Sequence, residues 1–426
     1  MPYPCESAAQ CVLDGQTGTC EPEGYCSLPD ADCPSGRRYS EHAPAELSRA
    51  CVGEASSGDS SDEGGPACEG PECGCARALV VAQDRSCAVT NAGRLLCWGD
   101  NAAATGRIVD PDAGADSMLP SPHPLGLPGV RHVALGSEHA CAATLDGVRC
   151  WGSNARGQVS ATPRSSMSAM VEGITTPTGF DSSEVDAVGV GLGWSCALVG
   201  GRAQLTCWGA PAGTSREGPA WIVSADAPVH GLAMARNSAC ARVGAEVHCA
   251  GVPPMQGGWE LAAVLGAPDD EALAPVSGPA MVVGIAASPK HYCASSEDQA
   301  WCWGINGAGE VGTGTAETVG ITALEIGATA MGLADDVTCG VVDGAVQCLG
   351  ADPLDADAAT SSVPRPLPTP GVEGAIVEVG VGHDHVCVRT DLDHVWCWGD
   401  GTHGQLGLGD FESALQPQRV ALECAG

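Results

Sequence analysis

Cysteine is the residue type with the most chemical potential in this chain, which contains 24 of them. Fourteen fall into seven pairs whose members are nine to eleven residues apart, and Trp-Gly follows the second member in five pairs. The pairs are Cys87 with Cys97, Cys141 with Cys150, Cys196 with Cys207, Cys240 with Cys249, Cys293 with Cys302, Cys339 with Cys348, and Cys387 with Cys397. Local pairs at regular spacing favour disulfides in an oxidising compartment. Structural thiols in a reducing cytosol are the alternative interpretation.

Histidine is the second residue type that could do chemistry. His139, His291 and His385 each lie two positions before the first cysteine of a pair, where Trp194 stands in another unit. Recurrence at one register favours an architectural role over a metal site or a catalytic ring.

Carboxylates and short motifs provide weaker candidates. Residues 110–116 alternate aspartates as a calcium loop does, but they lack a third alternate acidic residue and the distant glutamate. Residues 352–357 are interpreted as a solvated loop, with calcium as the minor alternative.

The Cys73-Gly-Cys75 step favours disulfides over a metal or redox site. No nucleophile elbow, phosphate loop, dinucleotide fingerprint or zinc-protease motif occurs in the sequence. We therefore expect no catalytic residue, no cofactor and no metal.

Short loops between the paired cysteines indicate the elements that position them. Asn91-Ala92-Gly93 and Leu145-Asp146-Gly147 are examples, and Gly, Asn and Asp tolerate the positive φ of tight hairpin turns. Directly opposed residues of antiparallel strands have Cα atoms ~4.5–5.5 Å apart, inside the ~4.4–6.8 Å window for disulfides. The spacing thus predicts seven β-hairpins, each closed by a bridge that restricts the unfolded chain by ~2–3 kcal/mol.

The Cys-Trp-Gly step indicates how the hairpins pack. Neighbouring strand residues point to opposite faces of a sheet, so Cys97 and Trp98 need different apolar neighbours. Burying both faces requires another sheet on each side, as in propeller blades. First cysteines recur after 54, 55, 44, 53, 46 and 48 residues, and such a period is typical of propellers and solenoids.

Three segments resemble repeats of the regulator of chromosome condensation family, and two upstream segments are similar to its Gly-x-x-His step. They are CWGSNARGQV (150–159), CWGINGAGEVGTG (302–314), CWGDGTHGQLGLGD (397–410), GSEHACA (136–142) and GHDHVCV (382–388). The resemblance covers about residues 78–424 and implies an all-β fold, a seven-bladed β-propeller. The fourth and sixth units, with CAGVPP (249–254) and CLGADP (348–353), lack the tryptophan.

The family's name-giving member is a chromatin-bound nucleotide exchange factor for a small GTPase. We do not transfer that activity to an acidic chain with the cysteine content of an exported protein. Secreted bacterial propellers of this repeat type are the closer analogy, including an inhibitor of β-lactamase that grips its enzyme with face loops. Fold analogy by itself is a weak basis for function.

Composition shifts predict three parts of the chain. Residues 1–52 form a Cys-rich disulfide module, because six cysteines stand there with almost no apolar periodicity. Residues 53–77 form an acidic flexible linker. Residues 78–426 form the propeller.

Charge and hydropathy exclude several partners. The chain has 52 acidic and 19 basic residues, a net charge of −33, which repels nucleic acid and anionic membranes. No apolar run approaches the length of a transmembrane helix. We expect a monomer in an extracytoplasmic location (secreted, periplasmic or cell-surface), although no export signal is visible at Met1.

Ring closure predicts one further disulfide. Cys75 directly precedes the first expected strand and Cys424 follows the last, so closing the ring should bring them together. A Cys75–Cys424 bridge leaves Cys68–Cys73 as a local pair, and Cys73–Cys424 is the close competitor.

Two functions remain open on these grounds. The first is a non-catalytic binding scaffold that recognises a protein or glycan through propeller-face loops. The second is an exported hydrolase or lyase with its site at the channel mouth. Aromatic residues outside the repeat template are the candidate partner contacts, because Trp and Tyr often anchor interfaces. They are Trp221, Trp259, Tyr292 and Phe180.

Overall fold

The computed structural model describes residues 11–13, 16–20, 26–29, 37–39, 76–101, 118–127, 129–160, 170–175, 185–199, 204–210, 221–224, 227–251, 273–314, 318–324, 327–355 and 358–422. The chain divides into two compact units, residues 1–70 and 71–426. The predicted linker, 53–77, lies outside the described residues except for Ala76 and Arg77, which already belong to the first propeller strand.

The described residues of the N-terminal unit form five short strands. They are β1 (Val12–Leu13), β2 (Gln16–Thr17), β3 (Thr19–Cys20), β4 (Cys26–Pro29) and β5 (Arg37–Tyr39), arranged as the pair β1-β2 and the sheet β3-β4-β5. A disulfide joins Cys11 to Cys26, with Cα atoms 5.3 Å apart.

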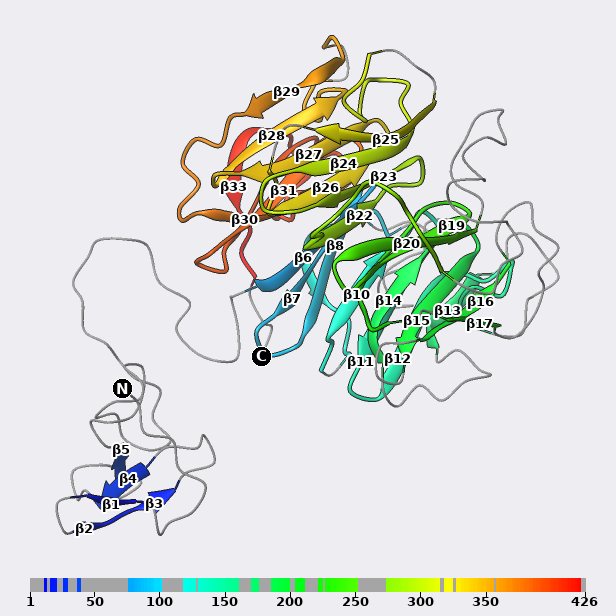
Figure 1. Ribbon diagram of the computed structural model, residues 1–426. Helices are drawn as coiled ribbons and strands as arrows, with labels where there is room; N and C mark the ends of the chain where they lie inside the picture. Colours follow the sequence, from blue (N-terminus) through cyan, green and yellow to red (C-terminus); the bar gives the residue numbers. More distant parts are fainter. Residues whose placement is uncertain are drawn as a thin grey trace. The chain divides into compact units, whose positions relative to one another are not determined.

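The second unit is a ring of seven four-stranded antiparallel sheets, a seven-bladed β-propeller (Figure 1). Blade 1 contains β6 (Ala76–Ala82), β7 (Arg85–Thr90), β8 (Leu95–Gly99) and β9 (Leu119–Pro124). Blade 2 contains β10 (His132–Leu135), β11 (His139–Thr144), β12 (Gly147–Ser153) and β13 (Met170–Thr175). Blade 3 contains β14 (Val185–Val190), β15 (Trp194–Val199), β16 (Gln204–Gly209) and β17 (Trp221–Ser224).

The remaining blades follow the same order. Blade 4 contains β18 (Val229–Met234), β19 (Ser238–Val243), β20 (Glu246–Gly251) and β21 (Ala274–Pro275). Blade 5 contains β22 (Gly284–Ala287), β23 (His291–Ser295), β24 (Ala300–Ile305) and β25 (Thr318–Leu324). Blade 6 contains β26 (Ala330–Ala334), β27 (Val337–Val342), β28 (Ala345–Gly350) and β29 (Ser361–Leu367). Blade 7 contains β30 (Ile376–Val381), β31 (His385–Thr390), β32 (Val395–Gly399) and β33 (Ala414–Arg419). None of the described residues form a helix with the length and apolar character that crossing a bilayer needs.

All seven predicted cysteine pairs are disulfides, each between the second and third strands of one blade. The two members of each pair are direct register partners, and their Cα atoms are 4.0 to 4.1 Å apart. This spacing is that of the narrower pair type in an antiparallel ladder. In blade order the bridges join Cys87 to Cys97, Cys141 to Cys150, Cys196 to Cys207, Cys240 to Cys249, Cys293 to Cys302, Cys339 to Cys348, and Cys387 to Cys397.

Apolar layers between neighbouring blades make up the core. The disulfide face of each blade packs on the opposite face of the next, so that Cys87 and Cys97 of blade 1 lie in one cluster with Trp151 of blade 2. The same arrangement joins the blade 7 bridge to Trp98 of blade 1. Leu349 takes the place of the tryptophan in blade 6. The prediction that both faces of the Cys-Trp-Gly strand are buried is confirmed.

Ring closure uses contacts between blades 1 and 7 rather than an exchanged strand, since each blade is built from consecutive strands. The Leu79 amide donates to Glu378 Oε2 (3.1 Å), and Asn91 Nδ2 donates to Asp393 Oδ2 (3.0 Å). The cysteines of the predicted Cys75–Cys424 bridge lie outside the described residues.

Candidate functional site

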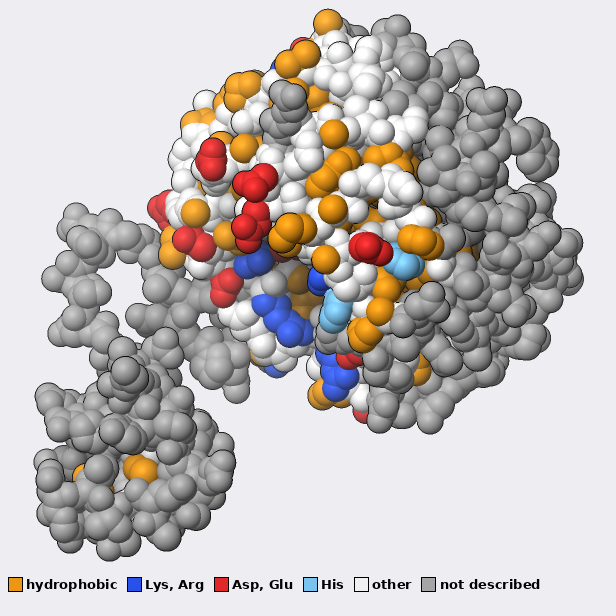
Figure 2. Space-filling model, viewed as in Figure 1, with side chains coloured by type: hydrophobic (Ala, Val, Ile, Leu, Met, Phe, Trp, Pro, Cys, Tyr) orange, Lys and Arg blue, Asp and Glu red, His pale blue; other side chains and the backbone are white. Residues whose placement is uncertain are grey.

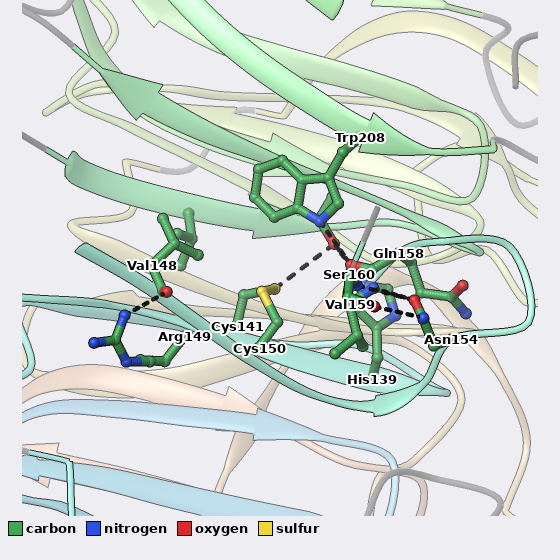
Figure 3. The surroundings of a disulfide bond; sticks show 12 residues. His139, Cys141, Val148, Arg149, Cys150, Asn154, Gln158, Val159, Ser160 and Trp208 are labelled. Atoms are coloured by element: carbon green, nitrogen blue, oxygen red, sulfur yellow. Dashed lines mark hydrogen bonds between the residues drawn. A yellow bond between two sulfur atoms is a disulfide. The ribbon is translucent and has the colours of Figure 1, made fainter. Parts of the chain in front are cut away.

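A hydrogen-bond group beside the disulfide joins neighbouring blades at several junctions, and Figure 3 shows the one between blades 2 and 3. His139 Nε2 lies 2.7 Å from Ser195 Oγ. The Ser195 hydroxyl donates to the Gln158 carbonyl (3.0 Å), and the Trp208 indole donates to the same oxygen (2.8 Å). This arrangement gives one carbonyl two donors from the next blade, and we call it the interblade lock.

The lock recurs where the ring closes. His385 Nε2 lies 3.0 Å from Ser86 Oγ, and the Gln405 carbonyl accepts from Ser86 (3.2 Å) and from the Trp98 indole (2.9 Å). Between blades 5 and 6 only the first contact is present, His291 Nε2 to Thr338 Oγ1 at 2.7 Å.

Burial sets the protonation of the three lock histidines. Each side chain is fully buried, and desolvation of the charged imidazolium lowers the pKa of His139 and His291 to about 3 and that of His385 to about 4. The rings are therefore neutral near pH 7 and occupied by contacts with the next blade. The structure assigns them the architectural role that their register indicated.

One residue of each blade, four positions before the first cysteine of the pair, lies at the same end of the propeller. We call these seven residues the turn mouth. These residues are Gln83, Ser137, Leu192, Arg236, Pro289, Asp335 and His383. They lie in the turns between the first and second strands, and all seven line a central cavity of about 170 Å³. Every blade thus contributes to one small concave site.

Two charge pairs stand at the turn mouth. Lys290 Nζ lies 2.7 Å from Asp336 Oδ1 and 3.9 Å from Asp335 Oδ2. His383 Nδ1 lies 3.5 Å from Asp84 Oδ1 across the junction of blades 7 and 1. Their hydrogen bond raises the pKa of His383 and lowers that of Asp84, because it favours the charged form of each.

The residue ten positions before the first cysteine of each pair lies at the start of the first strand, at the end away from the turn mouth, and we call these seven residues the hairpin mouth. These residues are Arg77, Arg131, Asp186, His230, Val283, Thr329 and Val377. In blades 1, 3, 4 and 7 the residue is the extra one of a β-bulge in the first strand. In the other three it immediately precedes that strand and donates its amide to the second strand. Bulges re-aim side chains and are common beside functional sites.

The side chains of the hairpin mouth are diverse. Six of the seven are exposed and Asp186 is half-buried. Arginines stand in adjacent blades 1 and 2, whereas blades 5 to 7 contribute Val283, Thr329 and Val377. Figure 2 shows Lys and Arg side chains over β6–β8 and β10 on the viewed face, with Asp, Glu, His and apolar side chains beside them and around the hollow.

The four predicted partner contacts are not all among the described residues, and those that are lie in strands. Tyr292 is fully buried in β23, where its hydroxyl donates to the Ser238 carbonyl (2.6 Å), so its side chain is packed inside the propeller. Trp221 begins β17 opposite Cys207, and its side chain is not among those described. Trp259 and Phe180 lie outside the described residues.

One of the two candidate calcium segments lies partly within the described residues. Residues 110–116 lie outside the described residues, and Asp352 accepts a hydrogen bond from the Leu354 amide (3.0 Å) within its own turn. No group of three potential metal ligands forms among the described residues.

Sequence reasoning missed both mouths. Their signal was available in the constant offsets of four and ten positions upstream of the first cysteine. Residue type varies freely at both offsets, so no motif marks them, and only the repeat alignment does.

Comparisons with known proteins agree with this architecture. Family descriptions of the regulator of chromosome condensation (RCC1) repeat match residues 130–158, 376–405 and 393–423. The human E3 ubiquitin-protein ligase HERC2 is 27% identical over 139 residues, which are 30% of this chain and 3% of that protein. The chain therefore spans only a small part of this curated relative.

Two solved structures share the fold at low identity. Human WBSCR16 is 17% identical with a TM-score of 0.60, covering 77% of this chain and 94% of that one. Yeast RCC1 (Prp20), in a structure bound to Kap60, is 16% identical with a TM-score of 0.61, covering 80% and 84%.

Proposed function

We propose that this chain, which belongs to the RCC1-like repeat family, is an exported, non-catalytic scaffold that binds a protein through one face of its propeller. The observation that carries the proposal is that some positions of each repeat form the frame of the propeller while others vary. Cysteine recurs in all seven repeats, tryptophan in five and the lock histidine in three, and these side chains hold the blades and their interfaces together. The positions four and ten residues before the first cysteine vary in residue type, and those at four line the central cavity. Repeat proteins typically recognise partners with such variable positions on a constant frame.

Relatives support binding as the general role. The yeast protein of similar fold was solved bound to Kap60, and a second structure is described with its binding properties to Gsp1p and histones. Those partners are properties of the yeast protein.

Export is supported by the disulfides. Seven hairpin bridges and Cys11–Cys26 are formed, and no described cysteine is a free thiol. Such density is typical of secreted proteins, since cytosolic reductants keep thiols reduced.

The test is capture of a partner from the native secretome by the full chain, followed by cross-link mapping. We expect cross-links to converge on one mouth, and substitution there to abolish capture. Arg236→Ser serves for the turn mouth and Arg77→Ser for the hairpin mouth. Arg419→Ser, on the exposed outer strand β33, is the matched control. Capture that survives both mouth substitutions would contradict binding through a propeller face.

One observation favours the second candidate, an exported hydrolase or lyase. Asp84 and His383 form a carboxylate–imidazole pair at the edge of the cavity, and a carboxylate that orients histidine is a common general-base arrangement. A screen of ester, glycoside and uronide substrates with the wild-type chain and His383→Gln separates the two functions. Turnover that disappears in His383→Gln would establish the enzyme.

A further inference from the structure

We propose that the hairpin mouth binds an extended segment of a partner protein that has acidic residues at one end and apolar residues at the other. The inference rests on the proposed scaffold function and names the chemistry of its partner. It follows from the unequal distribution of charge around one structurally equivalent ring of seven positions.

The cationic side of the hairpin mouth lies on blades 1 and 2. Arg77, Arg94 and Arg131 are exposed there. Backbone contacts bring them together, because the Arg77 guanidinium donates to the Val130 carbonyl and the Val130 amide donates to the Gly93 carbonyl (2.8 Å). The three arginines therefore all belong to the junction of blades 1 and 2.

No carboxylate among the described residues lies within ion-pair distance of these three arginines. Two acids of blade 7 that lie near blade 1 have a partner of their own, since Arg389 contacts Glu378 Oε2 (2.8 Å) and Asp393 Oδ1 (3.1 Å). In a chain of net charge −33, an uncompensated arginine cluster is unexpected unless an anionic group from outside completes it. Guanidinium groups bind carboxylates in a bidentate manner.

The apolar side lies on blades 5 to 7. Val283 and Val377 of the ring are 50% and 37% exposed, and Met281 beside the ring is 78% exposed. Thr329 of blade 6 stands between the two valines. Aliphatic side chains at a channel mouth are a surface that a partner's apolar side chains can cover.

These two sides favour a protein segment over a polyanion. The overall negative charge opposes acidic ligands at long range, but at physiological salt it is screened beyond about 8 Å. A short acidic stretch then meets mainly the arginines. A nucleic acid or a sulfated glycan carries negative charge along its whole length. Part of such a ligand would therefore lie against Asp186, which repels it, and against the valines, which cannot pair with its charges.

The experiment selects peptides from a random display library with the full chain as bait. We expect enriched sequences that combine an Asp/Glu cluster with an aliphatic or aromatic cluster. The Arg77→Ser/Arg131→Ser double variant should lose the acidic preference and bind a wild-type-selected peptide about tenfold more weakly, with less salt dependence. The Val283→Ser/Val377→Ser double variant should lose the apolar preference.

Controls make every outcome decisive. Arg242→Ser/Arg419→Ser removes two arginines that are not among the hairpin-mouth residues and should leave the selection unchanged, and thermal unfolding checks that all variants fold. Peptides that carry neither signature, or are selected equally by both mouth variants, would overturn this inference while leaving the scaffold function intact. Failure to enrich any peptide counts against both. Tighter binding of heparin than of the selected peptides would assign the arginines to polyanions and overturn the peptide proposal.

Discussion

Glu310 takes the place that Gln158 and Gln405 have in other blades, with an oxygen where they have an amide nitrogen. Gln158 Oε1 accepts from the Arg156 amide and Gln405 Oε1 from the His403 amide, both at 2.8 Å. Glu310 Oε2 accepts from Ala308 in the same way (2.7 Å). Its second oxygen, Oε1, is buried without a hydrogen-bond partner. Burial raises the pKa of this carboxyl, since ionising it there lacks solvation.

Glu310→Gln should therefore stabilise the propeller at neutral pH by about 1 kcal/mol, because it removes a buried ionisable group while keeping the loop hydrogen bond. The folded-state pKa of Glu310 is raised, so the wild type binds this proton more tightly when folded. Its penalty is absent below the ordinary carboxyl pKa and grows as pH rises through the raised value. Denaturant unfolding at several pH values should show the variant's advantage shrinking in acid. An advantage independent of pH would disprove this explanation.

The contribution of His139 to the stability of the fold depends on pH in the opposite direction. Its folded pKa is lowered to about 3, so the unfolded chain binds a proton between pH ~6.5 and that value while the folded chain does not. Stability should fall with decreasing pH across this window, by up to about 1.4 kcal/mol per pH unit for the group. His139→Gln should reduce that slope although it lowers stability at pH 7. Leu415→Ala, which removes an exposed side chain that does not titrate, is the control and should leave the slope unchanged.

Residue-level prediction succeeded where the repeat constrained it. The lock histidines were identified as architectural from their common register alone. Tyr292 was predicted as a partner contact because its aromatic side chain departs from the template, although it directly precedes Cys293 in a strand. In the structure its ring stacks on Trp303 with centroids 5.6 Å apart. Its hydroxyl reaches Ser238 of the preceding blade, a contact across blades that a single sequence does not display.

At the level of elements, the tryptophan that follows five of the seven hairpin disulfides is the main packing residue. Trp151 is 1% exposed and lies against Cys87 and Cys97 of blade 1. Trp151→Ala should lower the free energy of unfolding by ~3–5 kcal/mol through lost burial and a residual cavity. Denaturant titration measures this cost, and Leu415→Ala is the comparison because Leu415 is 91% exposed. Similar losses in both variants would contradict the assignment of Trp151 to the core.

Hairpin disulfides allow a direct chemical check. Peptide mapping without reduction should find each of the seven pairs bonded within its own blade. Replacing Cys141 and Cys150 together by alanine should cost roughly 2–3 kcal/mol, since this small loop gains freedom in the unfolded chain. Free thiols at most of these positions after alkylation would remove the basis for export.

Hairpins were predictable because the cysteine spacing and the turn residues specify them locally. The bulges of β6, β14, β18 and β30 were not, because an extra residue in the first strand carries no residue-type signature. They depend on how that strand pairs with the second.

At the level of the whole molecule, closure of the ring depends on side chains as well as on the backbone. Asp393 accepts from Arg389 within blade 7 and from Asn91 of blade 1. The predicted Cys75–Cys424 disulfide would add a covalent closure at the same junction. A non-reduced digest should contain the Cys424 peptide bonded to one that carries Cys75, or to Cys73 as the competitor. A Cys424 peptide bonded to any other cysteine would refute both pairings.

Every blade consists of consecutive strands and holds its disulfide within itself. A duplication or deletion of one repeat in the gene therefore adds or removes cysteines two at a time. An even number of cysteines in the chain stays even. No remaining cysteine loses its partner, so the oxidised chain is not left with a reactive thiol that could misassemble. The number of blades can accordingly change in evolution without rebuilding the covalent framework of those that stay.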